Sequence, residues 1–360
     1  MFLSVIHRQF PSASGMHPRL QRAFSPGTLE QVVLWTEECM SKVDGVGVAF
    51  CGGGFRSYAE VAVVENLARE GITIGAVAGT SMGSLVAALV GAGLSPQRVA
   101  ELLVELDHRV VETGTLKNLR LRVINMVTSN GIVESEKMQE LARSVLGEAG
   151  IHTFGDFIMP VAMPAVDIVS GELTVFTNDP ELFKSTGAGW TCISGDDLDV
   201  ASCACASASY PLVIAPTAYR GHVYMDGGCR MNLPTPLFDR SSVDAVVGVG
   251  MIRQLEPLND LKPLAIAQRT MSCGANQLDR LHAQAADIYV NLPVSGADAF
   301  QAGTGQQVID EAREMLRANP VDWSPARPSA FSAMRRAAVD AIASMVRGWQ
   351  SSQQNFQQNS

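Results

Sequence analysis

The pentapeptide Gly79-Thr80-Ser81-Met82-Gly83 carries the first residue whose type and spacing suit covalent chemistry. It fits the pattern G-x-S-x-G, in which a serine lies on a sharp turn between a strand and a helix. Gly79 and Gly83, two residues to either side, let the backbone pass close without side-chain clashes. The hydroxyl is then exposed at the carboxyl edge of a sheet, where helix N–H groups stabilise developing negative charge. The pattern predicts Ser81 as a nucleophile.

A run of three glycines, Gly52-Gly53-Gly54, is followed by Phe55 and Arg56. Successive glycines before a helix form a concave nest of backbone N–H groups that suits an oxyanion or a phosphate. The phosphate interpretation is weaker, because neither G-x-x-x-x-G-K-[ST] nor G-x-G-x-x-G occurs at this place. From the residues alone, the run can hold an oxyanion or, less well, a phosphate, or it can be a structural turn without a further role.

The third motif, Asp226-Gly227-Gly228, follows an uncharged stretch from Ala201 to Tyr219. An aspartate at the end of a short strand can act as a general base, although an Asp-Gly pair is also an ordinary turn. An aspartate with a pKa near 4 is a poor base at neutral pH. We therefore expect burial in an apolar cleft to raise the pKa of Asp226.

Together, and in this order, the three motifs resemble those of the patatin-like phospholipases. The similarity covers about residues 44–318. Ser57 departs from the family pattern, which usually has glycine after the arginine, and this puts the geometry of the nest in question. Other segments that resemble the family are Ala201-Ser202 with Pro211 and Pro216, Asn232 and Pro234 after the aspartate, Leu173–Phe176 after Ser170-Gly171, and the helix Gly305–Ala312.

The resemblance implies a lipid acyl hydrolase of phospholipase A or lysophospholipase type with a Ser-Asp dyad. Ser81 would attack an ester carbonyl and Asp226 would accept its proton. The three glycines would hold the oxyanion, and water would hydrolyse the acyl-enzyme. Arg56 would steady the nest or attract a lipid phosphate. The resemblance implies no cofactor and no metal ion.

Two alternatives stay open at this point. Ser81, Asp226 and His282 have the chain order of an α/β-hydrolase triad. Against a triad, His282 falls within an expected helix, where a histidine more often packs or faces solvent. The second alternative is a catalytically silent module that binds lipid or a protein partner.

Alternating strands and helices around these motifs predict an α/β fold of three layers, with a central mostly parallel sheet flanked by helices. The region 95–150 is expected to be mostly helical. Expected strands are Val46–Cys51, Ile72–Ala78, Val161–Val169, Leu173–Phe176, Val223–Asp226, Val243–Gly250 and Ile288–Leu292. Further expected helices are Leu29–Lys42, Tyr58–Glu70, Met82–Gly93, Asn276–Ala286, Thr304–Arg317, with Thr304 as N-cap, and Ser329–Gln350.

This pattern predicts four parts. Residues 1–43 form an N-terminal arm and helix, and 44–318 form the acyl hydrolase domain. Residues 319–350 form a linker and an amphipathic helix, and 351–360 a disordered tail. Leu116–Val127 is a second amphipathic stretch. It is expected to pack on the core or to form a lid at a membrane surface.

Of the 360 residues, 47% are hydrophobic, 18% are charged, and the net charge is −9. This charge argues against nucleic acid as a partner.

The uncharged stretch from Gly71 to Gln97 is long enough to cross a bilayer, but its glycines favour a strand, a turn and a helix. Seven cysteines without C-x-x-C argue against disulfides and zinc. We expect a cytoplasmic protein without signal peptide that contacts membranes transiently; a homodimer stays open.

Overall fold

The middle strands of the central sheet are short apolar runs rich in valine, alanine and glycine, and they are buried along almost their whole length. Strand β1 (Val46–Phe50) and strand β8 (Val246–Gly250) contain no exposed residue. Parallel strands that are covered on both faces have such continuous apolar sequences. The computed structural model describes residues 43–116, 133–183, 189–255, 257, 262–295 and 299–327, all within the compact unit Val43–Pro328.

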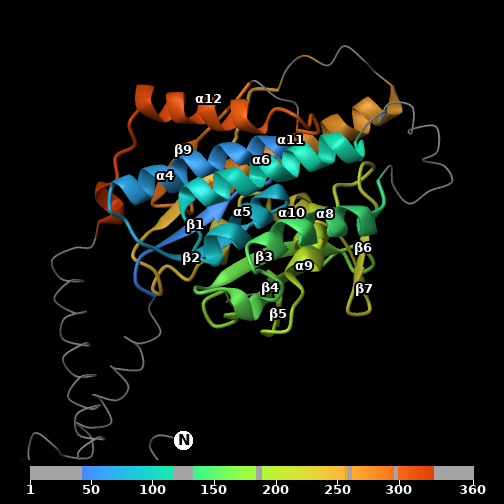
Figure 1. The fold of residues 1–360 in the computed structure, drawn as a ribbon, viewed down its shortest axis with the longest axis horizontal. Helices are drawn as coiled ribbons and strands as arrows, with labels where there is room; N and C mark the ends of the chain where they lie inside the picture. The colour runs from blue at the N-terminus through green and yellow to red at the C-terminus, as the bar shows by residue number, and fades with distance from the viewer. Residues whose placement is uncertain are drawn as a thin grey trace, which may run out of the picture. The chain divides into compact units, whose positions relative to one another are not determined.

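The sheet is mixed and mostly parallel, as the sequence predicts (Figure 1). Parallel pairing joins β2 to β1 and β3, β1 to β8, β8 to β9, and β4 to β5. Antiparallel pairing joins β3 to β4 and β7, and β6 to β7. The remaining strands are β2 (Ile74–Gly79), β3 (Val161–Asp167), β4 (Leu173–Thr177), β5 (Thr191–Ser194), β6 (Thr217–Tyr219), β7 (His222–Asp226) and β9 (Ile288–Asn291).

Strand β3 brings the ends of β2 and β7 together. β2 pairs with Val161 and Ala162 at the start of β3, and β7 pairs with Ala165–Asp167 at its end. The other edge of β3 is occupied by β4. Because β2 runs parallel to β3 and β7 antiparallel, the carboxyl ends of β2 and β7 converge beside the middle of β3.

Pro164 lies at this point of convergence. Proline lacks an N–H group and is rarely tolerated inside a central strand. The N and O atoms of one strand residue face the same edge, and the Pro164 carbonyl accepts a hydrogen bond from Ser207 rather than from a strand. The position where Pro164 lacks an N–H group therefore faces the gap between β2 and β7, where no neighbouring strand could accept a hydrogen bond.

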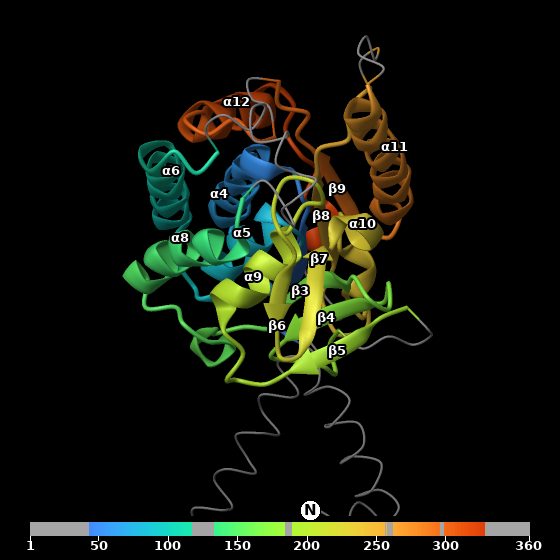
Figure 2. The same ribbon diagram turned by 90° about the vertical axis from the view of Figure 1, so that its right-hand side faces the viewer.

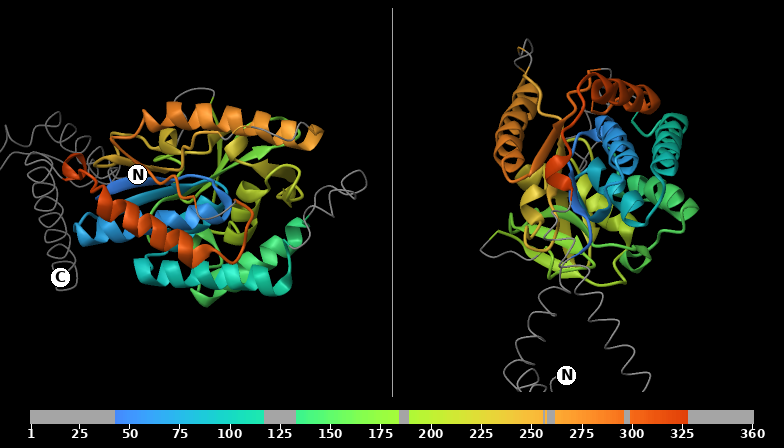
Figure 3. Two further views of the ribbon diagram at one scale, coloured as in Figure 1. Left: turned by 90° about the horizontal axis from the view of Figure 1, so that it is seen from above. Right: turned by 90° about the vertical axis from the view of Figure 1, so that its left-hand side faces the viewer.

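Helices cover both faces of the sheet, which gives the expected three layers (Figures 2 and 3). The larger group lies on one face, and α11 with the short α10 lies on the other. The first group comprises α4 (Val61–Arg69), α5 (Met82–Gly91), α6 (Pro96–Thr113), α8 (Ser135–Glu148), α9 (Val200–Ala208) and α12 (Gly305–Ala318). The second group comprises α10 (Gly228–Met231) and α11 (Pro263–Ala283). The 3₁₀ helices η1 (Gly54–Glu60), η3 (Phe154–Asp156) and η5 (Ser324–Ala326) pack in the same core as the first group, and η4 (Thr235–Leu237) packs in the other core.

The sheet separates two hydrophobic cores. Side chains of a strand alternate between its faces. Accordingly, Val48 and Phe50 of β1 pack in the larger core, and Ala49 and Cys51 pack in the smaller one. The uncharged stretch of the sequence divides into β2, a turn and α5. No helix among the described residues is long and apolar enough to cross a membrane.

Most expected elements are found, with shifted ends. The helix expected over Asn276–Ala286 is longer and begins at Pro263. The segment expected as a linker contributes Trp323, which is buried and donates to Asn66 Oδ1 at 2.8 Å. The stretches 1–42, 117–132 and 328–360 lie outside the described residues. They include the helices expected at Leu29–Lys42 and Ser329–Gln350, nearly all of Leu116–Val127, and the expected tail.

Helix α12 is held at its start by a side chain from another helix. Thr304 lies at the N-cap position, as expected, but its side chain makes no capping hydrogen bond, because its hydroxyl donates to Gln301 O. Asp107 of α6 accepts from the N–H groups of Gly303 and Gly305, each at 2.7 Å. A carboxylate at a helix N-terminus satisfies donors that have no partner inside the helix.

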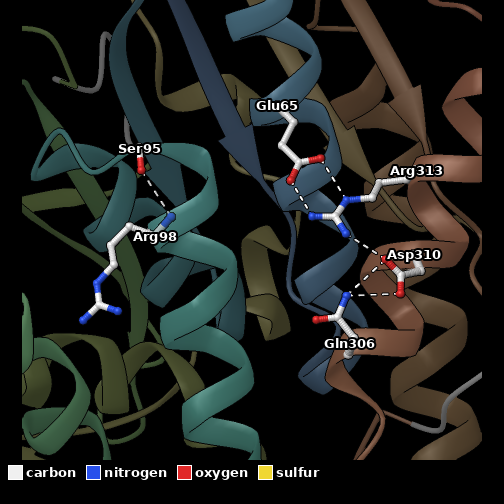
Figure 4. A network of polar contacts seen from close by, with 6 residues as sticks. All are labelled: Glu65, Ser95, Arg98, Gln306, Asp310 and Arg313. Atoms are coloured by element: carbon white, nitrogen blue, oxygen red, sulfur yellow. Dashed lines mark hydrogen bonds and ion pairs between the residues drawn. The ribbon is translucent and has the colours of Figure 1, made fainter.

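Charged contacts on the surface also join α12 to α4 (Figure 4). Arg313 donates to Glu65 through Nη2 at 2.6 Å and Nε at 3.0 Å, and to Asp310 through Nη1 at 2.7 Å. Gln306 donates to Asp310 in turn. In the same view Ser95 caps α6 by accepting from Arg98 N–H at 3.2 Å.

We predict that Asp107→Ala lowers the free energy of unfolding by about 2 kcal/mol, because it leaves two N–H groups without an acceptor. Urea denaturation measures this as a lower midpoint with an unchanged slope. Glu112→Ala is the control, since Glu112 is exposed on the same helix. Equal midpoints for the two variants would show that Asp107 does not hold α12.

Candidate active site

Ser81 lies on the sharp turn that its motif predicts, between β2 and α5. Its backbone has φ 54 and ψ −130, in a region that residues with a side chain rarely adopt. The turn depends on Gly79, because a Cβ there would lie 2.0 Å from the carbonyl oxygen of Gly83. Only glycine permits this close approach of two backbone segments.

Hydrogen bonds from neighbouring elements hold the turn. The Ser81 N–H donates to Ser207 Oγ of α9 at 2.9 Å, and this hydroxyl donates to the Pro164 carbonyl at 2.6 Å. The carbonyl of Ser81 accepts from Ser84 Oγ at 2.6 Å. The nucleophile is thus tied to α9 and β3 by its backbone, which leaves its hydroxyl available.

Asp226 ends β7 and is buried beside this turn. Its Oδ1 accepts from the N–H of Gly228 at 2.7 Å, and its own N–H donates to Ser209 O at 2.9 Å. Among the described residues Oδ2 has no hydrogen-bond partner, although the Ser81 hydroxyl lies near enough to favour the charged form.

Burial raises the pKa of Asp226 to about 6, as the sequence predicts. The Ser81 hydroxyl and the Gly228 N–H act in the opposite direction, because both stabilise the carboxylate. A carboxyl group with such a pKa is a useful base near neutral pH and is still largely ionised there.

The glycine run begins directly after β1 and lies against the serine. A Cβ at Gly52 would lie 2.9 Å from Ser81 Cβ and 2.4 Å from Asn232 Oδ1. The N–H of Gly52 donates to the Asn232 carbonyl at 3.1 Å. The expectation that all three glycines offer free donors is therefore wrong for Gly52.

Gly53 and Gly54 fit the role of oxyanion donors better. In the described part of the chain their N–H groups have no hydrogen-bond partner. Gly54 has φ +60 and starts η1, so the loop turns sharply here. Arg56 Nε donates to the Gly53 carbonyl at 3.3 Å, which fixes this side chain to the loop.

The glycines after Asp226 pack against the same centre. A Cβ at Gly227 would lie 2.2 Å from the Pro164 carbonyl oxygen, and one at Gly228 would lie 2.9 Å from Asp226 Oδ1. The three sequence motifs therefore meet at the carboxyl ends of β1, β2 and β7. Among the described residues, no group of three or more His, Cys, Asp or Glu is placed to hold a metal ion.

His282 lies on α11, one turn beyond Asp279, and makes no hydrogen bond to the dyad among the described residues. It lies near the end of α11, where its carbonyl accepts from Thr235 Oγ1 at 2.6 Å. Burial lowers the pKa of its imidazole, and Nδ1 has no partner among the described residues. No hydrogen bond between described residues links it to Ser81 or Asp226, so a triad has no support in this geometry.

Sequence reasoning missed several residues around the site. Ser207 falls in an alanine- and serine-rich helix and carries no motif. Asp279 of α11 accepts from Asn232 Nδ2 at 2.9 Å, and nothing in its sequence neighbourhood indicates this. Asn232 was marked by the pattern after Asp226, but the pattern does not state what the side chain contacts.

Similar proteins come from bacteria and fungi. YqhO of Bacillus subtilis is 26% identical over 215 residues, which cover 58% of this chain and 70% of that protein. An NTE family protein of Mycobacterium tuberculosis is 26% identical over 225 residues and 62% of this chain. This chain spans about half (54%) of that relative. Lysophospholipase NTE1 of Candida albicans is 23% identical over 60% of this chain and 14% of its own length.

Two solved structures match this chain at low sequence identity. VipD from Legionella pneumophila matches with a TM-score of 0.41 and 14% identity, over 77% of this chain and 66% of that one. ExoU of Pseudomonas aeruginosa, solved in complex with SpcU, matches with a TM-score of 0.36 and 16% identity, over 77% of this chain and 53% of that one. The family model described as patatin-like phospholipase matches residues 48–239, more than half of the chain, and the protein therefore belongs to the patatin-like phospholipase family.

Proposed function

We propose that this protein hydrolyses the acyl esters of lipids through a covalent intermediate on Ser81. The observation that carries the proposal is the meeting of a serine at φ 54 with a buried aspartate whose pKa is raised to about 6. Membership of the patatin-like phospholipase family and the similarity to a lysophospholipase support a lipid substrate. A phospholipid or another acyl-ester lipid, reached by transient contact with a membrane surface, fits this chemistry.

In the first half-reaction, Ser81 Oγ bonds to the ester carbonyl carbon and its proton passes to Asp226. The carbonyl oxygen becomes an oxyanion that faces the N–H groups of Gly53 and Gly54. Each donor of this kind contributes about 3 to 4 kcal/mol to transition-state stabilisation. The bond to the alcohol oxygen then breaks, and Asp226 returns the proton to this leaving group.

In the second half-reaction, water attacks the acyl-enzyme and gives a proton to Asp226. The second oxyanion uses the same two donors. When it collapses, the acid is released and the proton returns to Ser81 Oγ. Arg56 supports the loop through its bond to Gly53 O, and its positive charge also suits a lipid phosphate.

We predict that Ser81→Ala and Asp226→Asn each lower kcat/KM for nitrophenyl acyl esters and phospholipids by about 10³-fold or more. Ester hydrolysis by purified protein measures this. The controls are Ser144→Ala, on the surface of α8, and Asp167→Asn on β3, which we expect to leave hydrolysis unchanged. Wild-type hydrolysis no faster than that of both site variants would identify a silent binding module.

The raised pKa of Asp226 leads to a pH dependence. The base must be ionised to accept the serine proton, so activity is lost as the pH falls through about 6. We expect kcat/KM to be about tenfold lower at pH 5 than at pH 7, with a plateau above pH 7. A flat profile between pH 5 and pH 7, with the fold intact by circular dichroism, would contradict Asp226 as the base.

We predict that His282→Ala retains ester hydrolysis within about twofold of the wild type, because the imidazole does not contact either member of the dyad. Both kcat/KM and the thermal unfolding midpoint are measured for the His282→Ala variant and for the wild type. Loss of hydrolysis at an unchanged midpoint would favour the triad of an α/β-hydrolase over the dyad.

A further inference from the structure

Asn232 holds both polar groups of Gly52. Its carbonyl accepts from the Gly52 N–H at 3.1 Å, and its side-chain Nδ2 donates to the Gly52 carbonyl at 3.2 Å. It lies four residues beyond Gly228, and its Oδ1 would lie 2.8 Å from a Cβ at that glycine. This one residue therefore joins the glycine run to the motif that carries Asp226.

The hydrogen bond from Asn232 Nδ2 to the Gly52 carbonyl also affects the orientation of Gly53. The peptide unit is planar and trans, so the Gly52 carbonyl and the Gly53 N–H lie in one plane and point in opposite directions. A side chain that fixes the carbonyl also fixes the direction of the N–H. Since Asn232 binds from one side, the Gly53 donor is directed to the other.

Asp279 in turn orients the Asn232 amide. Its Oδ2 accepts from Asn232 Nδ2 at 2.9 Å, and the backbone of Leu233 lies near enough to favour the charged form of Asp279. An amide nitrogen has two hydrogens, which here serve Gly52 O and Asp279 Oδ2. Both partners accept only, so the amide cannot turn over without losing both bonds. Asp279 is buried, which strengthens this constraint.

The strand side of the loop has its own support. The Cys51 N–H donates to the fully buried Glu60 at 2.7 Å, and Ser57 Oγ donates to the Cys51 carbonyl at 3.1 Å. These contacts fix the peptide units before Gly52. The orientation of the unit that follows depends on Asn232.

We propose that Asn232, oriented by Asp279, is a positioning residue that directs the Gly53 N–H at the oxyanion formed on the substrate carbonyl. This assignment rests on the proposed acyl hydrolase function. It acts through backbone geometry, and neither side chain touches the reacting atoms. Its effect belongs to the transition state, because the donor matters most when negative charge develops.

The test compares an ester with the matching thionoester, in which sulfur replaces the carbonyl oxygen and accepts hydrogen bonds weakly. For Asn232→Ala we expect kcat on the oxygen ester to fall between about tenfold and about a hundredfold with KM nearly unchanged. Turnover of the thionoester should fall much less, so the preference for oxygen over sulfur shrinks. A purely structural role would lower both rates by the same factor.

Asp279→Ala provides a second variant that leaves the loop sequence untouched, and it should reproduce the loss of preference. Asp279→Asn keeps an oxygen acceptor and should retain most of the preference for the oxygen ester. The double variant of Asn232→Ala with Asp279→Ala should have the same kcat and the same oxygen-over-sulfur preference as Asn232→Ala alone, because both substitutions remove the same constraint. Asn276→Ala is the matched control on the same helix, since its amide donates to Arg253 O and not to the glycine run.

The outcomes separate the two proposals. A wild type that turns over neither ester, like Ser81→Ala, overturns the proposed function and this assignment with it. An active wild type whose Asn232→Ala and Asp279→Ala variants keep the full oxygen-over-sulfur preference overturns the positioning role alone. Equal losses on both esters in these variants also overturn it.

Discussion

The site depends on one backbone constraint, the close contact between Gly79 and Gly83 that permits the turn at Ser81. A positive φ at a residue with a side chain costs about 1 to 3 kcal/mol and persists only when its surroundings enforce it. Here the enforcing contacts are specific. Ser207 Oγ accepts a hydrogen bond from the Ser81 N–H, and Ser84 Oγ donates one to the Ser81 carbonyl. The Thr80 hydroxyl donates to Met231 O at 2.8 Å. The serine hydroxyl is presented because the backbone on either side is already satisfied.

The order of strands explains why an aspartate about 145 residues further along the chain meets this serine. β2 and β7 share one edge of β3 and approach each other head to head. The gap between them is filled by the Pro164 carbonyl, which receives Ser207 and lies against Gly227. A strand that continued past this point on either side would close the gap. The site thus occupies a place where the sheet changes from parallel to antiparallel pairing.

The sequence was sufficient to predict the motifs and the elements that flank them, because glycine runs next to apolar strands are local signals. Strand β5 was not predicted because Thr191–Ser194 is short and its burial does not alternate: its two end residues are exposed and the two between them are half-buried. Helix α9 is buried almost all round, so it has no polar face to mark its period. The pairs Asn232–Asp279 and Ser81–Ser207 join residues 47 and 126 positions apart, and no local pattern encodes such contacts.

The burial of Asp226 is a balance between two requirements of a base. Removal from water raises the pKa and makes the carboxylate a stronger acceptor for the serine proton, but further burial would leave it protonated at neutral pH. The Ser81 hydroxyl and the Gly228 N–H oppose this rise, which leaves the pKa at about 6. Gly228 contributes because the chain turns immediately after the aspartate and brings its N–H back to Oδ1. Gly228 therefore moderates the strength of the base and also shapes the turn.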